Sequence, residues 1–128
     1  DDSLVRGETM AGIVSMLRAA GAREVHERSA SPEIIRPCHW GVAIPTYEEL
    51  SAYNFPDINE RARVLGLDSL GYLSLEKLFD ACGADQETRD KFCAYCFGGN
   101  GPKMKNGEHP DSIPLRETVP VDLISSKF

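Results

Sequence analysis

The sequence predicts an α/β fold built on a parallel sheet, and three observations lead to this expectation. Four apolar residues recur at spacings of three and four and mark one face of a helix: Met10, Ile13, Val14 and Leu17. Gly21 would end that helix, and residues 23–28 then alternate weakly, as a strand does. An acidic pair and a Gly-containing loop precede the helix, and a strand–loop–helix–strand order favours parallel strands.

The middle of the chain is predicted to combine a structured loop with two short helices. Residues 29–45 contain three prolines and show no period, which indicates an irregular but ordered loop. Two capping-box patterns predict helices, one from Thr46 to about Tyr53 and one from Asp57 to Gly66. Thr9 is the expected N-cap of the first helix.

The last predicted elements lie between residues 70 and 97. Residues 70–73 are a candidate strand, Ser74 caps a helix that Gly83 ends, and Asp85 caps one or two more turns. Cys82 falls on the apolar face of this helix, so we expect it to be buried, which is the usual position of a free cysteine. From residue 98 onward no core pattern remains, and residues 98–128 are expected to be extended or partly disordered.

Composition restricts the classes of partner. The chain has 128 residues, 41% of them hydrophobic, which corresponds to one domain or less. A formal net charge of −6 argues against non-specific binding to nucleic acid. No apolar run approaches the ~18 residues of a membrane span and no leader precedes residue 1, so we expect no membrane partner and a cytoplasmic location. The first residues are a carboxylate pair with no strand before it, so we expect an incomplete chain.

The start of the chain has the chemistry of a sugar-phosphate site. Asp1 and Asp2 can accept hydrogen bonds from ribose hydroxyls or attract the Mg²⁺ that accompanies a diphosphate. Loop N–H groups and the helix N-terminus can hold a phosphate, Arg6 can neutralise its charge, Gly7 allows close approach of the backbone, and Thr9 offers a hydroxyl. Without further support, the acidic pair reads equally well as a flexible terminus.

The run Asp1-Asp2-Ser3-Leu4-Val5-Arg6-Gly7-Glu8-Thr9 resembles the phosphoribosyl diphosphate motif of type I phosphoribosyltransferases, in the form found in iron–sulfur type amidophosphoribosyltransferases. Further blocks resemble this family in the same order, among them Ala20-Gly21-Ala22-Arg23-Glu24-Val25-His26, Asp68-Ser69-Leu70-Gly71-Tyr72-Leu73 and Phe92-Cys93-Ala94-Tyr95-Cys96-Phe97. The resemblance implies that residues 1–97 are the C-terminal part of a type I phosphoribosyltransferase fold. In that part, a parallel sheet flanked by helices is followed by a helical, cysteine-containing extension.

The resemblance also implies the roles of the opening residues. Asp1 and Asp2 would contact the ribose hydroxyls and Mg²⁺. The residues that would wrap the 5′-phosphate are Ser3, Val5, Arg6, Gly7, Glu8 and Thr9. Glu8 departs from the forms of the family that carry Thr there, and we expect it to point outward, because a carboxylate facing a phosphate is repulsive.

Four cysteines without an export signal indicate metal ligands, redox groups or core residues instead of disulfides. Cys93 and Cys96 form a C-x-x-C, whose thiolates can reach one iron or zinc ion, and Cys38 in the proline-rich loop is the natural third ligand. A thioredoxin-like pair would begin a helix after a strand, whereas this pair follows a helix. His39 is an alternative zinc ligand or a plain loop residue, and Trp40 is expected to cover the loop.

The resemblance implies that Cys38, Cys93 and Cys96 hold a [4Fe–4S] cluster whose fourth ligand lies upstream of this chain. The implied enzyme moves glutamine-derived ammonia onto C1 of phosphoribosyl diphosphate and forms phosphoribosylamine, the first step of purine synthesis. A glutaminase domain and homo-oligomer formation belong to that picture. No residue here is a convincing general base, so we expect the chain alone to be inactive.

Two other functions remain open. One is a non-catalytic regulator that binds phosphoribosyl diphosphate through the same loop. The other is a small structural metal module that uses the three cysteines with His39 or Cys82 for zinc.

Overall fold

The computed structural model describes residues 1–102, so most of the predicted tail lies outside the described residues. The helices and strands follow one another as α1 (Glu8–Ala19), β1 (His26–Ser29), α2 (Ser51–Asn54), α3 (Ile58–Val64), β2 (Ser69–Tyr72) and α4 (Leu75–Ala81). Three short 3₁₀ turns complete the order, at Tyr47–Glu49, Arg89–Lys91 and Tyr95–Phe97.

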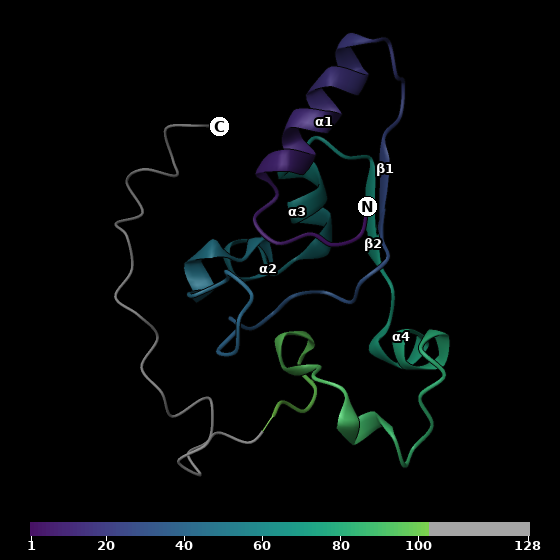
Figure 1. Ribbon diagram of the computed structural model, residues 1–128. Coiled ribbons are helices and arrows are strands. Elements are labelled where there is room, and N and C mark those ends of the chain that lie inside the picture. Colours follow the sequence, from purple (N-terminus) through teal and green to yellow (C-terminus); the bar gives the residue numbers. More distant parts are fainter. Residues whose placement is uncertain (103–128) are drawn as a thin grey trace.

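The two strands pair in parallel, as the sequence predicted. Their register runs from His26 opposite Ser69 to Ser29 opposite Tyr72, and Figure 1 shows them side by side with α1 and α3 toward one face. Parallel pairing arises because the chain passes through helices and loops before it returns to the sheet.

Asp1 lies beside β1 on the edge opposite β2. Its N–H donates to the carbonyl of Arg28 at 3.3 Å, and the N–H of Ala30 donates to the carbonyl of Asp1 at 2.9 Å. In a parallel pair of strands, one residue bonds in this way to the two residues on either side of its partner, so Asp1 runs parallel to β1 opposite Ser29. On the other edge of β1, the carbonyls of residues 25 and 29 accept from the chain around β2. The acidic pair therefore begins at the carboxyl end of β1.

One apolar cluster joins α1, α3 and the sheet; its buried members are Leu4, Met10, Val14, Val25, Ala62, Leu65 and Leu67. From α1, only Met10 and Val14 are buried, whereas Ile13 is 36% exposed and Leu17 43% exposed. Of the four residues in the predicted apolar stripe, two are therefore buried and two are partly exposed to solvent.

Three of the predicted caps are present, and one of them is Asp85, whose carboxylate accepts the N–H groups of Glu87 and Thr88 at 3.1 and 2.9 Å. The Asp57 carboxylate accepts from the N–H of Glu60 at 2.8 Å, and the Ser74 hydroxyl accepts from the N–H of Lys77 at 3.2 Å. The Thr9 cap is wrong, because α1 already begins at Glu8 after Gly7. The Thr46 cap is also wrong: its side chain makes no capping bond, and a 3₁₀ turn follows before α2.

The remainder, residues 31–50 and 74–102, is mainly irregular. A second apolar cluster lies here, with Ile34, Ile44 and Leu50 buried and Val5, Tyr47, Cys96 and Phe97 packed against them. No residue of α4 is buried, and Cys82, just after it, is exposed. The expectation of a buried Cys82 is therefore wrong: on that face Phe79 packs against Arg89 and Phe92, but the contacts do not extend to Cys82. Within the same range, no helix is long and apolar enough to cross a membrane.

Candidate phosphate and cysteine sites

The acidic pair lies at the carboxyl end of β1, where the loop to α1 starts. The Asp1 carboxylate accepts the N–H of Asp2 at 2.9 Å, and the Asp2 carboxylate accepts the N–H of Ser3 at 2.8 Å. Both aspartates are exposed. Two carboxylates at the carboxyl edge of a parallel sheet, beside a loop that opens a helix, are placed where such sheets bind ligands.

The loop between the acidic pair and α1 is held at several points. Leu4 is buried in the first apolar cluster, and the carbonyl of Val5 accepts from the N–H of Ser51 at 2.8 Å. Gly7 caps α1 with φ 91°, and a Cβ atom there would lie 2.8 Å from Cδ2 of Leu65. Both the positive φ and the contact require glycine, so the loop approaches α1 in one fixed conformation.

Arg6 is held away from the helix N-terminus. Its Nε donates to the Glu49 carboxylate at 2.7 Å, its Nη2 also contacts that carboxylate, and Nη2 donates to the carbonyl of Ala43 at 3.0 Å. The side chain expected to neutralise a phosphate therefore pairs with a carboxylate of the segment before α2. No sequence pattern pointed to Glu49 as its partner, because the two residues lie 43 positions apart.

Glu8 and Thr9 lie in the first turn of α1 and are both exposed. Neither side chain forms a hydrogen bond or ion pair with another residue of the described 1–102 segment. A helix N-terminus carries unpaired N–H groups and a partial positive charge, both of which favour an anion. The glycine cap and the free first turn together make a local anion-binding geometry in an otherwise acidic chain.

Backbone hydrogen bonds bring the Cys38 loop against the C-x-x-C. The carbonyl of Cys96 accepts from the N–H groups of Ile35 and Arg36 at 2.8 and 3.2 Å, and the N–H of Cys38 donates to the carbonyl of Ile44 at 2.9 Å. The two bonds to Cys96 join segments about sixty residues apart in the chain, and the bond to Ile44 closes the Cys38 loop itself. They support the expectation that Cys38 and Cys96 belong to one region.

The Cys38 sulfur accepts N–H groups from Trp40 and Val42, each at 3.4 Å. Burial raises the pKa of this thiol, but the N–H donors of residues 40–42 outweigh burial, and the net pKa lies below its usual value. N–H donors around sulfur favour the thiolate, which is the form that binds metals.

The other two cysteines differ from Cys38. Burial raises the pKa of the Cys96 thiol, and the nearby Cys93 and Cys38 thiols raise it further. Cys93 itself is exposed. The Cys38 loop and the C-x-x-C are thus neighbours through the backbone bonds to Cys96, while the three thiols differ in burial and in pKa.

The donor set fits a thiophilic metal group in kind, although the described residues do not form a closed site. Within residues 1–102, no three His, Cys, Asp or Glu side chains are placed to hold one metal ion. Three cysteines on two neighbouring segments are nevertheless the residue type that iron–sulfur and zinc centres prefer as ligands.

Aromatic rings cover the Cys38 loop. Trp40 meets Tyr95 edge-on at 5.2 Å between ring centroids, and His39 meets Tyr95 at 5.6 Å. The guanidinium of Arg36 lies 5.1 Å from the centre of the Tyr95 ring. Trp40 thus covers the loop as expected, and His39 is part of the same ring cluster.

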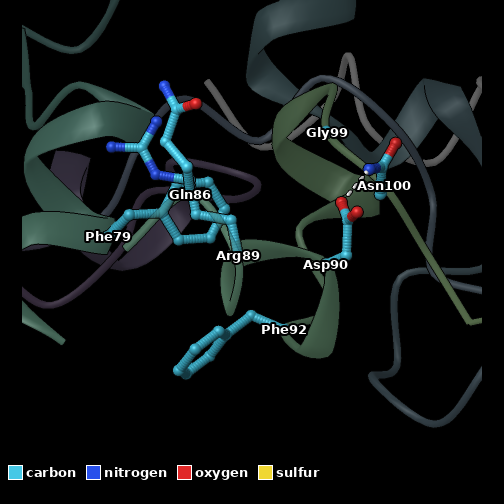
Figure 2. A pocket seen from close by; sticks show the side chains of 7 residues that line it. All are labelled: Phe79, Gln86, Arg89, Asp90, Phe92, Gly99 and Asn100. Carbon is cyan, nitrogen blue, oxygen red and sulfur yellow. Dashed lines mark hydrogen bonds between the residues drawn. The ribbon is translucent and has the colours of Figure 1, made fainter. Parts of the chain in front are cut away.

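A hollow of about 260 Å³ (Figure 2) is lined by Phe79, Gln86, Arg89, Asp90, Phe92, Gly99 and Asn100. The Arg89 guanidinium lies over the Phe79 ring at 5.3 Å, and the Asn100 amide donates to the Asp90 carboxylate at 2.8 Å. The hollow contains none of the site residues expected from the sequence.

Comparisons with known proteins agree on one group of enzymes. The chain is 45% identical to the amidophosphoribosyltransferase of Methanocaldococcus jannaschii over 84% of its own length and 22% of that protein. It is 42% identical to the Drosophila melanogaster enzyme over 89% of its own length and 20% of that protein. It is 46% identical to the chloroplastic amidophosphoribosyltransferase 2 of Arabidopsis thaliana, with coverages of 84% and 19%. A comparison with protein-family models finds no match.

Among solved structures, the chain is similar to the glutamine phosphoribosylpyrophosphate amidotransferase of B. subtilis complexed with ADP and GMP. The TM-score is 0.69 at 42% identity, over 80% of this chain and 22% of that one. A structure described as the allosteric regulatory enzyme of purine biosynthesis gives a TM-score of 0.66 at 41% identity, with the same coverages. The chain therefore spans about a fifth of the length of the proteins it matches.

Proposed function

We propose that this chain is the part of an amidophosphoribosyltransferase that holds the phosphoribosyl donor. It matches about a fifth of the length of each of these enzymes. Its parallel strands and flanking helices are the corresponding part of the fold of these enzymes. The observation that carries the proposal is the exposed acidic pair at the carboxyl end of β1, followed by a glycine-capped helix N-terminus.

In the proposed reaction, ammonia forms a bond to C1 of phosphoribosyl diphosphate, the bond from C1 to the diphosphate oxygen breaks, and diphosphate leaves. The attacking nitrogen loses a proton. Asp1 and Asp2 would bind the ribose hydroxyls and Mg²⁺, which neutralises charge on the leaving diphosphate when bound. The loop residues that would hold the 5′-phosphate are Ser3, Val5, Arg6, Gly7, Glu8 and Thr9.

We propose different roles for these loop residues in holding the 5′-phosphate. Gly7 and the first turn of α1 offer backbone N–H groups to the phosphate, which fixes C1 relative to the nucleophile. Val5 and Arg6 hold the loop in place through Ser51 and Glu49. The Arg6 Nε and Nη2 groups are engaged by Glu49 and Ala43, so its Nη1 group is the one that would be offered to the phosphate.

Calorimetric titration with phosphoribosyl diphosphate and Mg²⁺ tests this site in the full-length protein. We expect Asp2→Asn to weaken binding at least tenfold, because one carboxylate partner is lost. The control is Asp80→Asn, which changes an exposed aspartate of α4 and should leave binding unchanged. Equal affinities for the two variants would contradict the assignment of the acidic pair.

The isolated chain provides a second test. We propose that it is inactive alone, because a glutaminase domain elsewhere in the full-length enzyme supplies the ammonia and because no described residue is positioned as a general base. Formation of phosphoribosylamine by the purified chain with ammonia, Mg²⁺ and phosphoribosyl diphosphate would overturn this.

We further propose that Cys38, Cys93 and Cys96 are three ligands of a [4Fe–4S] cluster, with the fourth supplied from outside this chain. The N–H groups on the Cys38 sulfur and the backbone bonds that join the Cys38 loop to Cys96 support this. Iron and sulfide analysis of the anaerobically purified full-length protein tests it. Cys38→Ser should lose the cluster, and the exposed Cys82→Ser should keep it. Zinc without sulfide would favour the structural metal module.

From the similarity to amidophosphoribosyltransferases we also propose that the full-length protein forms a homo-oligomer and is located in the cytoplasm. Light scattering of the full-length protein measures the first. Imaging of the tagged protein measures the second, and the chloroplastic name of the Arabidopsis relative makes an organelle the competing outcome.

A further inference from the structure

Arg61 on α3 is a buried cation that none of the proposed chemistry uses. Its residue is 0% exposed and is among the largest fully buried side chains of the described segment. A buried charge is strongly unfavourable unless an opposite charge and hydrogen bonds compensate it. The partners that satisfy Arg61 therefore reveal which parts of the chain it holds together.

The guanidinium joins three separate segments. Its Nε donates to the carbonyl of Phe55 at 2.9 Å, and its Nη1 donates to the Tyr72 hydroxyl at 2.8 Å. Its Nη2 forms an ion pair with the Glu33 carboxylate at 2.6 Å and donates weakly to the carbonyl of Pro56 at 3.4 Å. The end of α2, strand β2 and the start of the proline-rich loop are thus tied to one side chain.

Glu33 is the point at which this network reaches the cysteine region. The next residue, Ile34, is buried in the second apolar cluster. The two after it, Ile35 and Arg36, donate their N–H groups to the carbonyl of Cys96. A shift of Glu33 would therefore disturb the bonds that set the spacing between the loop and the C-x-x-C.

We propose that Arg61 is a positioning residue for the cysteine site, and that its ion pair with Glu33 holds the Cys38 loop in register with Cys96. This inference rests on the proposed function of the three cysteines. Arginine suits the position because its planar fork can serve Glu33, Tyr72 and a backbone carbonyl at once, whereas a lysine ammonium is a single point charge.

The test uses the full-length protein with Glu33→Gln and Arg61→Lys, and with Arg63→Lys as the matched control. Arg63 lies on the same helix, is exposed, and has no ion pair within residues 1–102. Glu33 is partly exposed, so its isosteric replacement should fold even where Arg61→Lys does not. Two readouts are measured: amide hydrogen exchange, and titration of the metal-free protein with Co²⁺, whose thiolate absorption bands report the cysteine site.

We expect Glu33→Gln to accelerate exchange at Ile35 and Arg36 at least tenfold, to leave Val14 in α1 unchanged, and to weaken Co²⁺ binding at least tenfold. Arg63→Lys should change neither readout. Unchanged exchange at Ile35 and Arg36, or an equal acceleration at Val14, would overturn the inference, since the pair would then be irrelevant or only generally stabilising. If the unsubstituted protein takes up no Co²⁺, the proposed cysteine site fails, and the exchange at Ile35 and Arg36 alone decides on Arg61.

Discussion

The α/β region and the cysteine region of this chain are held together in different ways. In the α/β region, residues 1–30 and 57–73, regular elements surround a cluster of seven buried apolar residues. In the cysteine region, residues 31–56 and 74–102, only Ile34, Ile44 and Leu50 form the buried cluster, and most fixed contacts are backbone hydrogen bonds between loops. Periodic apolar residues on helices and strands therefore stabilise the first region. Three buried side chains and backbone hydrogen bonds between loops stabilise the second.

The largest effect is expected from a substitution in the small apolar cluster of the cysteine region. Leu50 is 0% exposed, and Leu50→Ala should lower the free energy of unfolding by about 3 kcal/mol, because a buried leucine leaves a cavity. Val64→Ala, at a residue 44% exposed, should cost less than about 1 kcal/mol. Urea unfolding measures both. Equal costs would mean that the cysteine region lacks a packed core.

A second test addresses the phosphate loop, residues 3–7, which belongs to the α/β region through Leu4 and contacts the cysteine region through Val5. Gly7 and Gly21 both have positive φ, but only at Gly7 would a Cβ atom meet a neighbour, at 2.8 Å from Leu65. Gly21→Ala should cost roughly 1–2 kcal/mol for the left-handed backbone alone. Gly7→Ala should cost more and should also weaken phosphoribosyl diphosphate binding, as measured by urea unfolding and calorimetry. If the two variants behave alike, Leu65 does not restrict the loop.

Removal of one helix cap in each region should have a smaller effect on the free energy of unfolding. Asp57→Ala removes the cap of α3 in the α/β region and should lower the global free energy of unfolding by about 1 kcal/mol. Ser74→Ala removes the cap of α4, which has no buried residue. It should accelerate amide exchange within α4 while the global unfolding free energy stays nearly constant. A full loss of about 1 kcal/mol with Ser74→Ala would show that the regions unfold as one unit.

The smallest effect is a difference in pH dependence. The N–H of Val25 and then Arg18 lower the pKa of Asp68 below its usual 3.8, so the charged form is favoured in the folded state. This stabilisation is present above the usual pKa and is lost as the pH falls through the lowered one. Asp68→Asn should therefore unfold more easily than the parent near pH 6, and the difference should shrink below pH ~3.

Asp85 in the cysteine region provides the comparison. Thr88 lowers the pKa of Asp85, with its hydroxyl as the largest cause. Asp85→Asn should change exchange in the local turn with little effect on the acid dependence of global unfolding. Denaturant titrations from pH 2 to 7 measure both variants. Identical acid profiles for Asp68→Asn and Asp85→Asn would remove the distinction between the regions at this level.

The sequence predicted most of the α/β region because local chemistry decides it. The parallel strands and the Asp57 cap are confirmed here, and the equally local caps at Ser74 and Asp85 are confirmed in the cysteine region. The strand boundary was wrong by three residues, and β1 begins only at His26. Before it, side chains hold the backbone: Asp68 accepts the N–H of Val25, and Arg18 donates to the carbonyl of Arg23. Such long-range contacts leave no local pattern.

The errors and omissions gather where long-range packing decides the outcome. Cys82 follows an apolar helical face, yet Arg89 and Phe92 pack only against Phe79 of that face and leave Cys82 exposed. Arg61 reads as a surface residue because it is charged, and only its remote partners explain its burial. The pairing of Arg6 with Glu49 was missed for the same reason.

The small cluster of Ile34, Ile44 and Leu50 has one more consequence. Val5 of the phosphate loop and Cys96 of the C-x-x-C pack against the same three side chains. The two segments are therefore poor modules for transplantation. A chimera that takes either one from a relative should also take residues 44–50, because a graft without its shared support would meet a surface shaped for another sequence.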